Sequence, residues 1–188
     1  VKSHAKLVYD NVSDWIEGQG DWAPADEIAD QPTALLDLTE ARTAWRNEHA
    51  LVFKDRPDYV FDLVPAGNVL AVRTEARRIS NRMNEASTIV ANACCADFLA
   101  QHIGHGIFNV HRAFEPEKAE AAQEFLAGQE IVVEREALTE LARYTELKRA
   151  LESRDDAWLD ARLRRFQGFT MMSAQPGPHF GLGLAAYA

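Results

Sequence analysis

Apolar residues recur at helical spacing through much of the chain and predict several amphipathic helices. Residues 24–47 read as helical with a break at Pro32, and residues 75–102 form the longest stretch of this kind. Gly104 and Gly106 are expected to end that long helix. Three further helices are predicted at residues 116–127, 135–152 and 156–166.

Between these helices, short apolar runs bounded by turn residues predict β structure. The runs at residues 50–53, 58–64 and 69–72 resemble strands, the last two forming a hairpin with a glycine turn. Residues 107–111 form another plausible strand, and residues 174–188 read as a Pro/Gly loop running into an apolar segment. The chain is therefore expected to be α+β, with short strands and a hairpin packed with several amphipathic helices.

The helical periods also predict which side chains face a core. In the helix at residues 75–102 the apolar stripe comprises Ile79, Met83, Ala86, Val90 and Cys94. The opposite, polar side comprises Arg78, Asn81, Glu85, Thr88 and Asn92. The later helices place on one side Leu138, Leu141, Tyr144, Leu147 and Leu151, and then Leu159, Leu163 and Phe166.

Composition and charge narrow the class of protein. The 188 residues are 47% hydrophobic and 26% charged, which suits one folded domain or most of one. Neither a membrane-spanning stretch nor a signal peptide is visible, so a cytoplasmic protein without membrane contact is expected. The net charge of -9 argues against a broadly basic nucleic-acid surface. Because residues 1–40 are strongly acidic and residues 41–112 slightly basic, any polyanion contact should centre on the middle of the chain.

Isolated motifs do not announce a complete active site. Cys94 and Cys95 are neighbours and cannot form an ordinary structural disulfide, so free thiols, buried or partly buried, are expected. The histidines at 102, 105 and 111 read as a cluster at a helix end without a metal, because glycines interrupt any common face. Neither a phosphate-binding glycine loop nor a serine nucleophile elbow occurs.

Three arginines, two aromatic residues and the polar stripe of the helix at residues 75–102 could have purely structural roles or could contact nucleic acid. Composition alone favours an ordinary solvated helix face for the polar stripe. It also makes Tyr9 and Phe53 core residues rather than stacking platforms for nucleobases. The run Arg77, Arg78 and Arg82 could contact phosphate groups.

Four stretches carry a resemblance that changes this balance. They are SHAKLVYDNVSDW (3–15), HALVFKDRPDY (49–59), ARRISNRMNEASTIVAN (76–92) and RRFQGFTMMSAQPGPHFGLGLAAYA (164–188). In order, and over essentially the whole chain, they resemble the RNB catalytic family of bacterial exoribonucleases II. The resemblance implies a metal-dependent 3' to 5' exoribonuclease that degrades single-stranded RNA to nucleoside 5'-monophosphates. It also implies that residues 1–188 form part of an RNB domain, without the flanking OB-type and S1-type domains.

The resemblance assigns roles to three residues of this chain. Phe53 matches an aromatic residue that stacks on bases near the RNA 3' end. Tyr9 matches a tyrosine that helps to set the terminal nucleotides in the cleavage pocket. Glu85 matches a glutamate that hydrogen-bonds ribose hydroxyls, although the family commonly has a second adjacent acid where this chain has Ala86.

Departures from the family pattern qualify this assignment. The family's Mg2+ is held by aspartates that precede the matched segment, so this chain is expected to hold no metal ligands. The first residue is Val and the last stretch is apolar, which suggests a fragment of a longer protein. We therefore expect a monomer that is inactive by itself and that belongs to an active parent enzyme. The alternative is a catalytically silent RNB-like module that binds RNA or protein, or a structural fragment.

Overall fold

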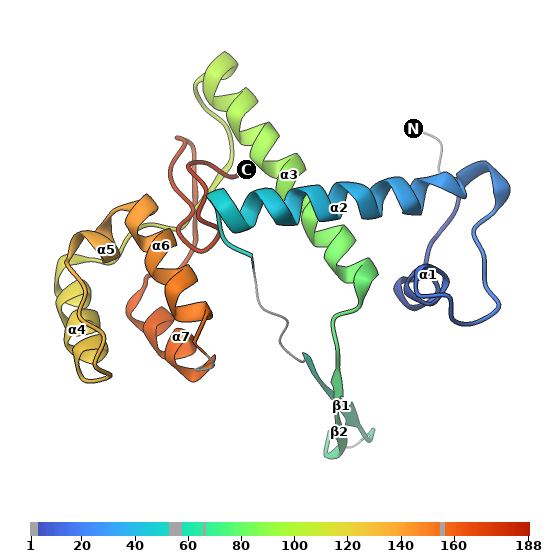
Figure 1. The fold of residues 1–188 in the computed structure, drawn as a ribbon, viewed down its shortest axis with the longest axis horizontal. Coiled ribbons are helices and arrows are strands. Elements are labelled where there is room, and N and C mark those ends of the chain that lie inside the picture. Colours follow the sequence, from blue (N-terminus) through green and yellow to red (C-terminus); the bar gives the residue numbers. More distant parts are fainter. Residues whose placement is uncertain (1–3, 53–57, 66, 155–156) are drawn as a thin grey trace. The chain divides into compact units, whose positions relative to one another are not determined.

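The computed structural model describes residues 4–52, 58–65, 67–154 and 157–188. The helices are α1 (Tyr9–Ile16), α2 (Asp30–His49), α3 (Ile79–Phe98), α4 (Pro116–Ala127), α5 (Glu136–Thr139), α6 (Leu141–Glu152) and α7 (Ala157–Leu163). Short 3-10 turns occur at Asp26–Ile28 and Arg164–Phe166, and a π-helical turn at Leu99–Ile103. The strands are β1 (Asp58–Leu63), β2 (Val69–Glu75), β3 (Phe108–Val110) and β4 (Met171–Ser173). The expected α+β class is confirmed (Figure 1).

The chain divides into two compact units, which are described separately. Unit 1 comprises residues 1–43 and 53–88, and unit 2 comprises residues 44–52 and 89–188. The division falls within α2 and within α3. Among the helices of the described residues, none combines the length and the apolar character that crossing a bilayer requires.

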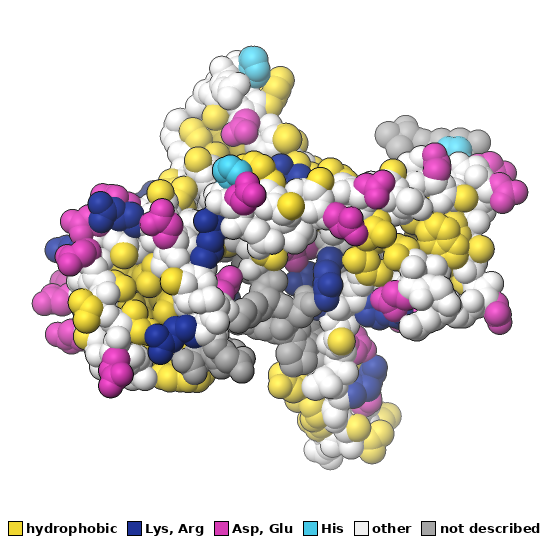
Figure 2. Space-filling model, in the orientation of Figure 1, with side chains coloured by type: hydrophobic (Ala, Val, Ile, Leu, Met, Phe, Trp, Pro, Cys, Tyr) yellow, Lys and Arg dark blue, Asp and Glu magenta, His cyan; other side chains and the backbone are white. Residues whose placement is uncertain are grey.

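In unit 1, the predicted hairpin is confirmed. Strands β1 and β2 pair antiparallel, with Phe61 opposite Val72, and Gly67 takes a positive φ of 83° in the turn. Apolar side chains lie exposed along both strands and are visible on the hairpin in Figure 2. Arg73 forms ion pairs with Asp62 at 3.3 Å and Glu75 at 2.7 Å.

Helix α2 begins after the 3-10 turn, so the break in the predicted helix precedes Pro32 rather than falling on it. Pro32 is the third residue of α2, where a missing backbone N–H costs no helical hydrogen bond. Residues 50–52 do not form the expected strand. Their carbonyls are bound by arginines instead: Leu51 accepts from Arg46 Nε at 2.8 Å, and Ala50 accepts from Arg149 at 3.0 Å.

Helix α3 confirms part of the expected stripe. Met83 and Ala86 are buried, but Cys94 and Cys95 are exposed, which makes the predicted burial of the thiols wrong. Ala96 is the fully buried residue of this turn. Because the buried positions recur about every three residues, the stripe drifts around the helix axis and passes the cysteines by.

The core of unit 2 lies among α4 to α7, which gather together in Figure 1. Its buried members are Phe114, Ala119, Ala122, Leu126, Leu138, Tyr144, Leu151, Leu159, Leu163 and Phe180. Burying one such large side chain contributes roughly 1.5–3 kcal/mol. The helix predicted at residues 116–127 is confirmed. The one predicted at 135–152 is two helices, separated at Glu140, whose backbone is extended (φ -106°, ψ 129°).

The C-terminal segment of unit 2 is more ordered than a loop. β3 pairs antiparallel with β4, a strand that the sequence analysis did not anticipate. Beyond β4, Leu182 and Leu184 are buried, and the Leu51 N–H donates to the Leu182 carbonyl at 3.1 Å. This segment therefore completes a second core cluster with Ala50.

Candidate functional site

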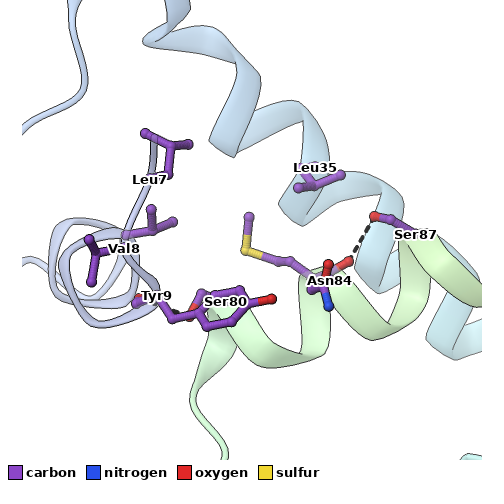
Figure 3. Close-up of a pocket in the computed structure, with 9 residues that line it drawn as sticks. Leu7, Val8, Tyr9, Leu35, Ser80, Asn84 and Ser87 are labelled. Atoms are coloured by element: carbon purple, nitrogen blue, oxygen red, sulfur yellow. Dashed lines mark hydrogen bonds between the residues drawn. The ribbon is translucent and has the colours of Figure 1, made fainter. Parts of the chain in front are cut away.

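Tyr9 is the first residue of α1 in unit 1, and its side chain is exposed. The residue is 51% exposed, so the core position that composition favours does not apply. Its carbonyl accepts a hydrogen bond from Ser80 Oγ at 2.8 Å. In Figure 3 the Tyr9 side chain extends from α1 across the first turn of α3. The backbone is thus held while the ring stays available.

A pocket of about 220 Å³ adjoins Tyr9. Figure 3 shows that its side chains come from α1 and the segment before it, from α2 and from α3. The lining residues are Leu7, Val8, Tyr9, Val12, Leu35, Ser80, Met83, Asn84 and Ser87. Most of them are apolar, so the pocket suits an apolar or aromatic group with a few polar contacts.

Glu85 lies on α3, one residue beyond Asn84 of the pocket lining, and its side chain is 19% exposed. Its carboxylate forms an ion pair with the Arg77 guanidinium. An ionised carboxylate is an acceptor-only group, so Glu85 can accept hydrogen bonds from arginine N–H groups or from hydroxyl groups. Ala86, which stands where the family commonly has a second acid, is buried in the apolar stripe.

Arg78 precedes α3 and pairs with acidic residues of α1 and of the position directly after it. Its Nη2 lies 2.7 Å from Asp14 Oδ1 and 2.6 Å from Glu17 Oε2, and its Nη1 lies 3.9 Å from Asp10 Oδ1. The hydrogen bonds to Glu17 and Asp14 raise the pKa of Arg78 above its ordinary value. A phosphate at this arginine would have to compete with those carboxylates.

The other predicted contacts are placed less fully. Arg77 faces Glu85, and Arg82 is exposed on α3. Phe53 lies outside the described residues. Tyr9, Glu85 and the arginine run all belong to unit 1.

The described parts of the chain do not supply a metal site. Among them there is no group of three or more His, Cys, Asp or Glu side chains that could hold a metal ion. His102 packs its ring on Phe98, with centroids 4.8 Å apart, and His111 packs on His179 at 5.5 Å. The described residues therefore do not offer a ligand set for the Mg2+ that the RNB resemblance implies.

Comparison with known proteins decides the family. The RNB domain family matches residues 1–188, the whole sequence. The chain belongs to the RNB family.

Curated RNB relatives are similar over the full chain. The chain is 48% identical over 189 residues to Exoribonuclease 2 of Klebsiella pneumoniae (strain 342), and 51% identical to Exoribonuclease 2 of Yersinia enterocolitica. Each match covers 100% of this chain and 29% of the relative. The chain thus spans less than a third of the length of these relatives.

Solved RNB-type structures share the fold. Mycoplasma genitalium RNase R, solved in complex with ribose-methylated single-stranded RNA, superposes with a TM-score of 0.78 at 17% identity, covering 95% of this chain and 28% of that one. An active-site mutant of the Dss1 exoribonuclease from Candida glabrata gives 0.60 at 20% identity, covering 97% and 21%. At these identities the similarity shows the fold alone.

The sequence analysis did not anticipate the contacts between α1 and α3 in this candidate site. Ser13 and Ser80 are both buried, and their Oγ atoms lie 2.7 Å apart. The spacing of Asp10, Asp14 and Glu17 was the available signal, because it places three acids on one face of a helix. Nothing local in the sequence identified Arg78 as their partner.

Proposed function

We propose that this chain is part of a 3' to 5' exoribonuclease that hydrolyses single-stranded RNA to nucleoside 5'-monophosphates. In this proposal, unit 1 holds the RNA 3' end through Tyr9, Phe53 and Glu85. The observation that supports it best is the junction of α1 with α3, where an exposed tyrosine and a partly buried glutamate lie on directly bonded elements.

Tyr9 suits the role of setting the terminal nucleotides, because the residue is half-exposed and can contact a base while its backbone is fixed. Stacking of a base on an aromatic ring is worth about 1–3 kcal/mol and tolerates any base. An exonuclease that consumes RNA of any sequence needs that tolerance. The apolar pocket beside Tyr9 offers further surface to an unstacked base.

Glu85 suits a sugar-recognition role. Its partly buried carboxylate accepts from Arg77, and a ribose 2'-hydroxyl is a donor that such a carboxylate can bind. A hydrogen bond to a charged group is worth roughly 1.5–3 kcal/mol, enough to favour ribose over deoxyribose about tenfold or more. Of the three arginines, Arg82 is the most exposed and is the best placed to contact an RNA phosphate, whereas a phosphate at Arg77 or Arg78 would compete with carboxylates.

Catalysis in this proposal depends on polypeptide beyond these residues. The Mg2+ that the activity requires would activate the attacking water, and its ligands would lie outside this chain. We accordingly propose that the 188-residue chain alone is a monomer without nuclease activity, and that the parent enzyme works in the cytoplasm.

A second candidate function is a silent RNB-like module that binds RNA or protein. The absence of a metal-binding cluster among the described residues is expected for this module and for the enzyme alike, so it does not separate them. Release of labelled mononucleotides by the intact protein with magnesium distinguishes the two: a time course that shows release supports the enzyme, and intact RNA supports the silent module.

The assigned residues are tested with matched RNA and DNA oligonucleotides. In the intact protein, Glu85→Ala should narrow the preference for RNA over DNA about tenfold or more, because only RNA has the 2'-hydroxyl that Glu85 is proposed to bind. Phe53→Ala and Tyr9→Ala should instead weaken both substrates, since stacking ignores the sugar. Tyr59→Ala is the matched control, because Tyr59 is 62% exposed on β1 and has no assigned role. An unchanged RNA/DNA ratio in Glu85→Ala would contradict the sugar-recognition role.

A further inference from the structure

A buried pair of hydroxyl groups joins α1 to α3 within unit 1. Ser13 on α1 is completely buried, and Ser80 in the first turn of α3 is 4% exposed. Their Oγ atoms are 2.7 Å apart, and the Ser80 N–H donates to Ser13 Oγ at 3.3 Å. Ser80 Oγ donates its one hydrogen to the Tyr9 carbonyl, so Ser13 must donate to Ser80. The hydrogens run in one direction, from Ser13 through Ser80 to Tyr9.

A more exposed contact reinforces this junction. Asp10 and Asp14 of α1, together with Glu17 directly after it, pair with the Arg78 guanidinium. Such exposed ion pairs are individually weak and are screened by salt. The buried hydroxyls, which salt screens less, should therefore hold α1 on α3 even at high ionic strength.

We infer that Ser13 and Ser80 are positioning residues that fix Tyr9 relative to Glu85. This inference rests on the proposed function, because it assumes that Tyr9 and Glu85 grip the same RNA end. Helix α1 has eight residues, too few to be stable without tertiary contacts. Ser80 and Glu85 lie on one helix, about 7.5 Å apart along its axis. A bond from Ser80 to the Tyr9 backbone therefore sets the position of Tyr9 in the frame that carries Glu85.

The test uses Ser80→Ala and Ser13→Ala in the intact protein, with two measurements. Hydrogen exchange of the amides at residues 9–16 reports whether α1 is held, and kcat/KM on RNA reports whether positioning matters. Both variants should raise exchange in α1 and lower kcat/KM roughly tenfold, because small misplacements of a substrate are costly. The double variant should lose little more than either single one, since the two hydroxyls form one chain of bonds.

Thr39→Val is the matched control. Thr39 is also buried in unit 1, but its Oγ1 donates to the Leu35 carbonyl within α2, so the change removes a hydroxyl without uncoupling two elements. Thr39→Val should lower the free energy of unfolding without changing hydrogen exchange in α1 or kcat/KM on RNA.

Three outcomes separate the inference from the proposed function. Unchanged exchange in α1 of Ser80→Ala would overturn the inference. Raised exchange in Ser80→Ala with a normal kcat/KM would also overturn the inference if Tyr9→Ala lowers kcat/KM. In that case Tyr9 would matter for activity, but holding α1 through Ser80 would not. The third outcome is raised exchange in α1 of Ser80→Ala, with a normal kcat/KM in both Ser80→Ala and Tyr9→Ala. It would uphold the hydroxyl pair as the anchor of α1 and overturn the role of Tyr9 in RNA binding.

Discussion

We predict that the C-terminal segment of unit 2 becomes less stable as the pH falls, because two histidines accept hydrogen bonds from its backbone. The Gly181 N–H donates to His111 Nδ1, and the Leu182 N–H donates to His179 Nδ1, each at 3.1 Å. A proton on either Nδ1 would remove the lone pair that accepts the bond. The neutral forms of both rings are therefore part of the folded structure.

The pKa values of these histidines give the sign and the size of the effect. Burial lowers the pKa of His179 to about 4, with the nearby His111 adding to the effect, and burial likewise lowers the pKa of His111. Because an unfolded histidine titrates near 6.5, the unfolded state binds more protons between about pH 6.5 and 4. The stabilising contribution is present above about pH 6.5 and is lost as the pH falls. From about pH 7.5 to 5 the loss for His179 is at most about 2 kcal/mol, and about 1 kcal/mol after allowance for its solvent-exposed part.

Hydrogen exchange in the intact protein measures this loss locally. Peptides covering residues 179–184 should lose about 1 kcal/mol of protection between about pH 7.5 and 5, after correction for intrinsic exchange rates. His179→Asn is the informative variant, because its Oδ1 can replace Nδ1 as an acceptor but does not titrate; it should show a smaller loss. Peptides from α4 serve as the internal control. Equal protection of residues 179–184 at both pH values would refute the reasoning.

Two further predictions concern stability. Leu126→Ala should cost about 2–5 kcal/mol in urea denaturation, because Leu126 is completely buried in the core of unit 2, whereas Val132→Ala, at a site 87% exposed, should change little. Gly104→Ala should cost about 1 kcal/mol, because Gly104 ends the helical segment with a φ of 77°, a conformation that alanine adopts at a cost. Gly168→Ala, which is free of both a positive φ and a close neighbour, is its control; equal melting temperatures for these two glycine variants would contradict the second prediction.

The helices of unit 2 could be predicted because their signal is local. Leucines at helical spacing require one buried face wherever the partner lies, and Leu138, Leu151, Leu159 and Leu163 are all buried. The break at Glu140 could not be predicted in this way. The Leu138 carbonyl accepts from the N–H of Phe114 at 3.4 Å, 24 positions earlier in the chain, instead of continuing a helix.

The candidate site was predictable only through resemblance. Periodicity left Glu85 on an ordinary polar face and placed Tyr9 in a core, whereas Tyr9 is half-exposed. The contacts around them join residues about 60 to 70 positions apart, as in the pairs of Ser13 with Ser80 and Arg78 with Glu17. The local sequence around a serine does not identify a hydrogen-bond partner that lies so far away in the chain.

The stretches that carry the family resemblance most specifically are also those that depend on distant contacts. LVYDNVSDW supplies Tyr9 and Ser13, which bond to α3, and PGPHFGLGLAAYA supplies His179, Leu182 and Tyr187. Tyr187 accepts from Asn92 at 2.9 Å, and its backbone carbonyl accepts from Asn109. A surface helix needs only an apolar face and tolerates many sequences, but a segment fixed by individual hydrogen bonds needs particular residues at particular positions. The same physical difference explains why these stretches identified the family while their structure could not be read from periodicity.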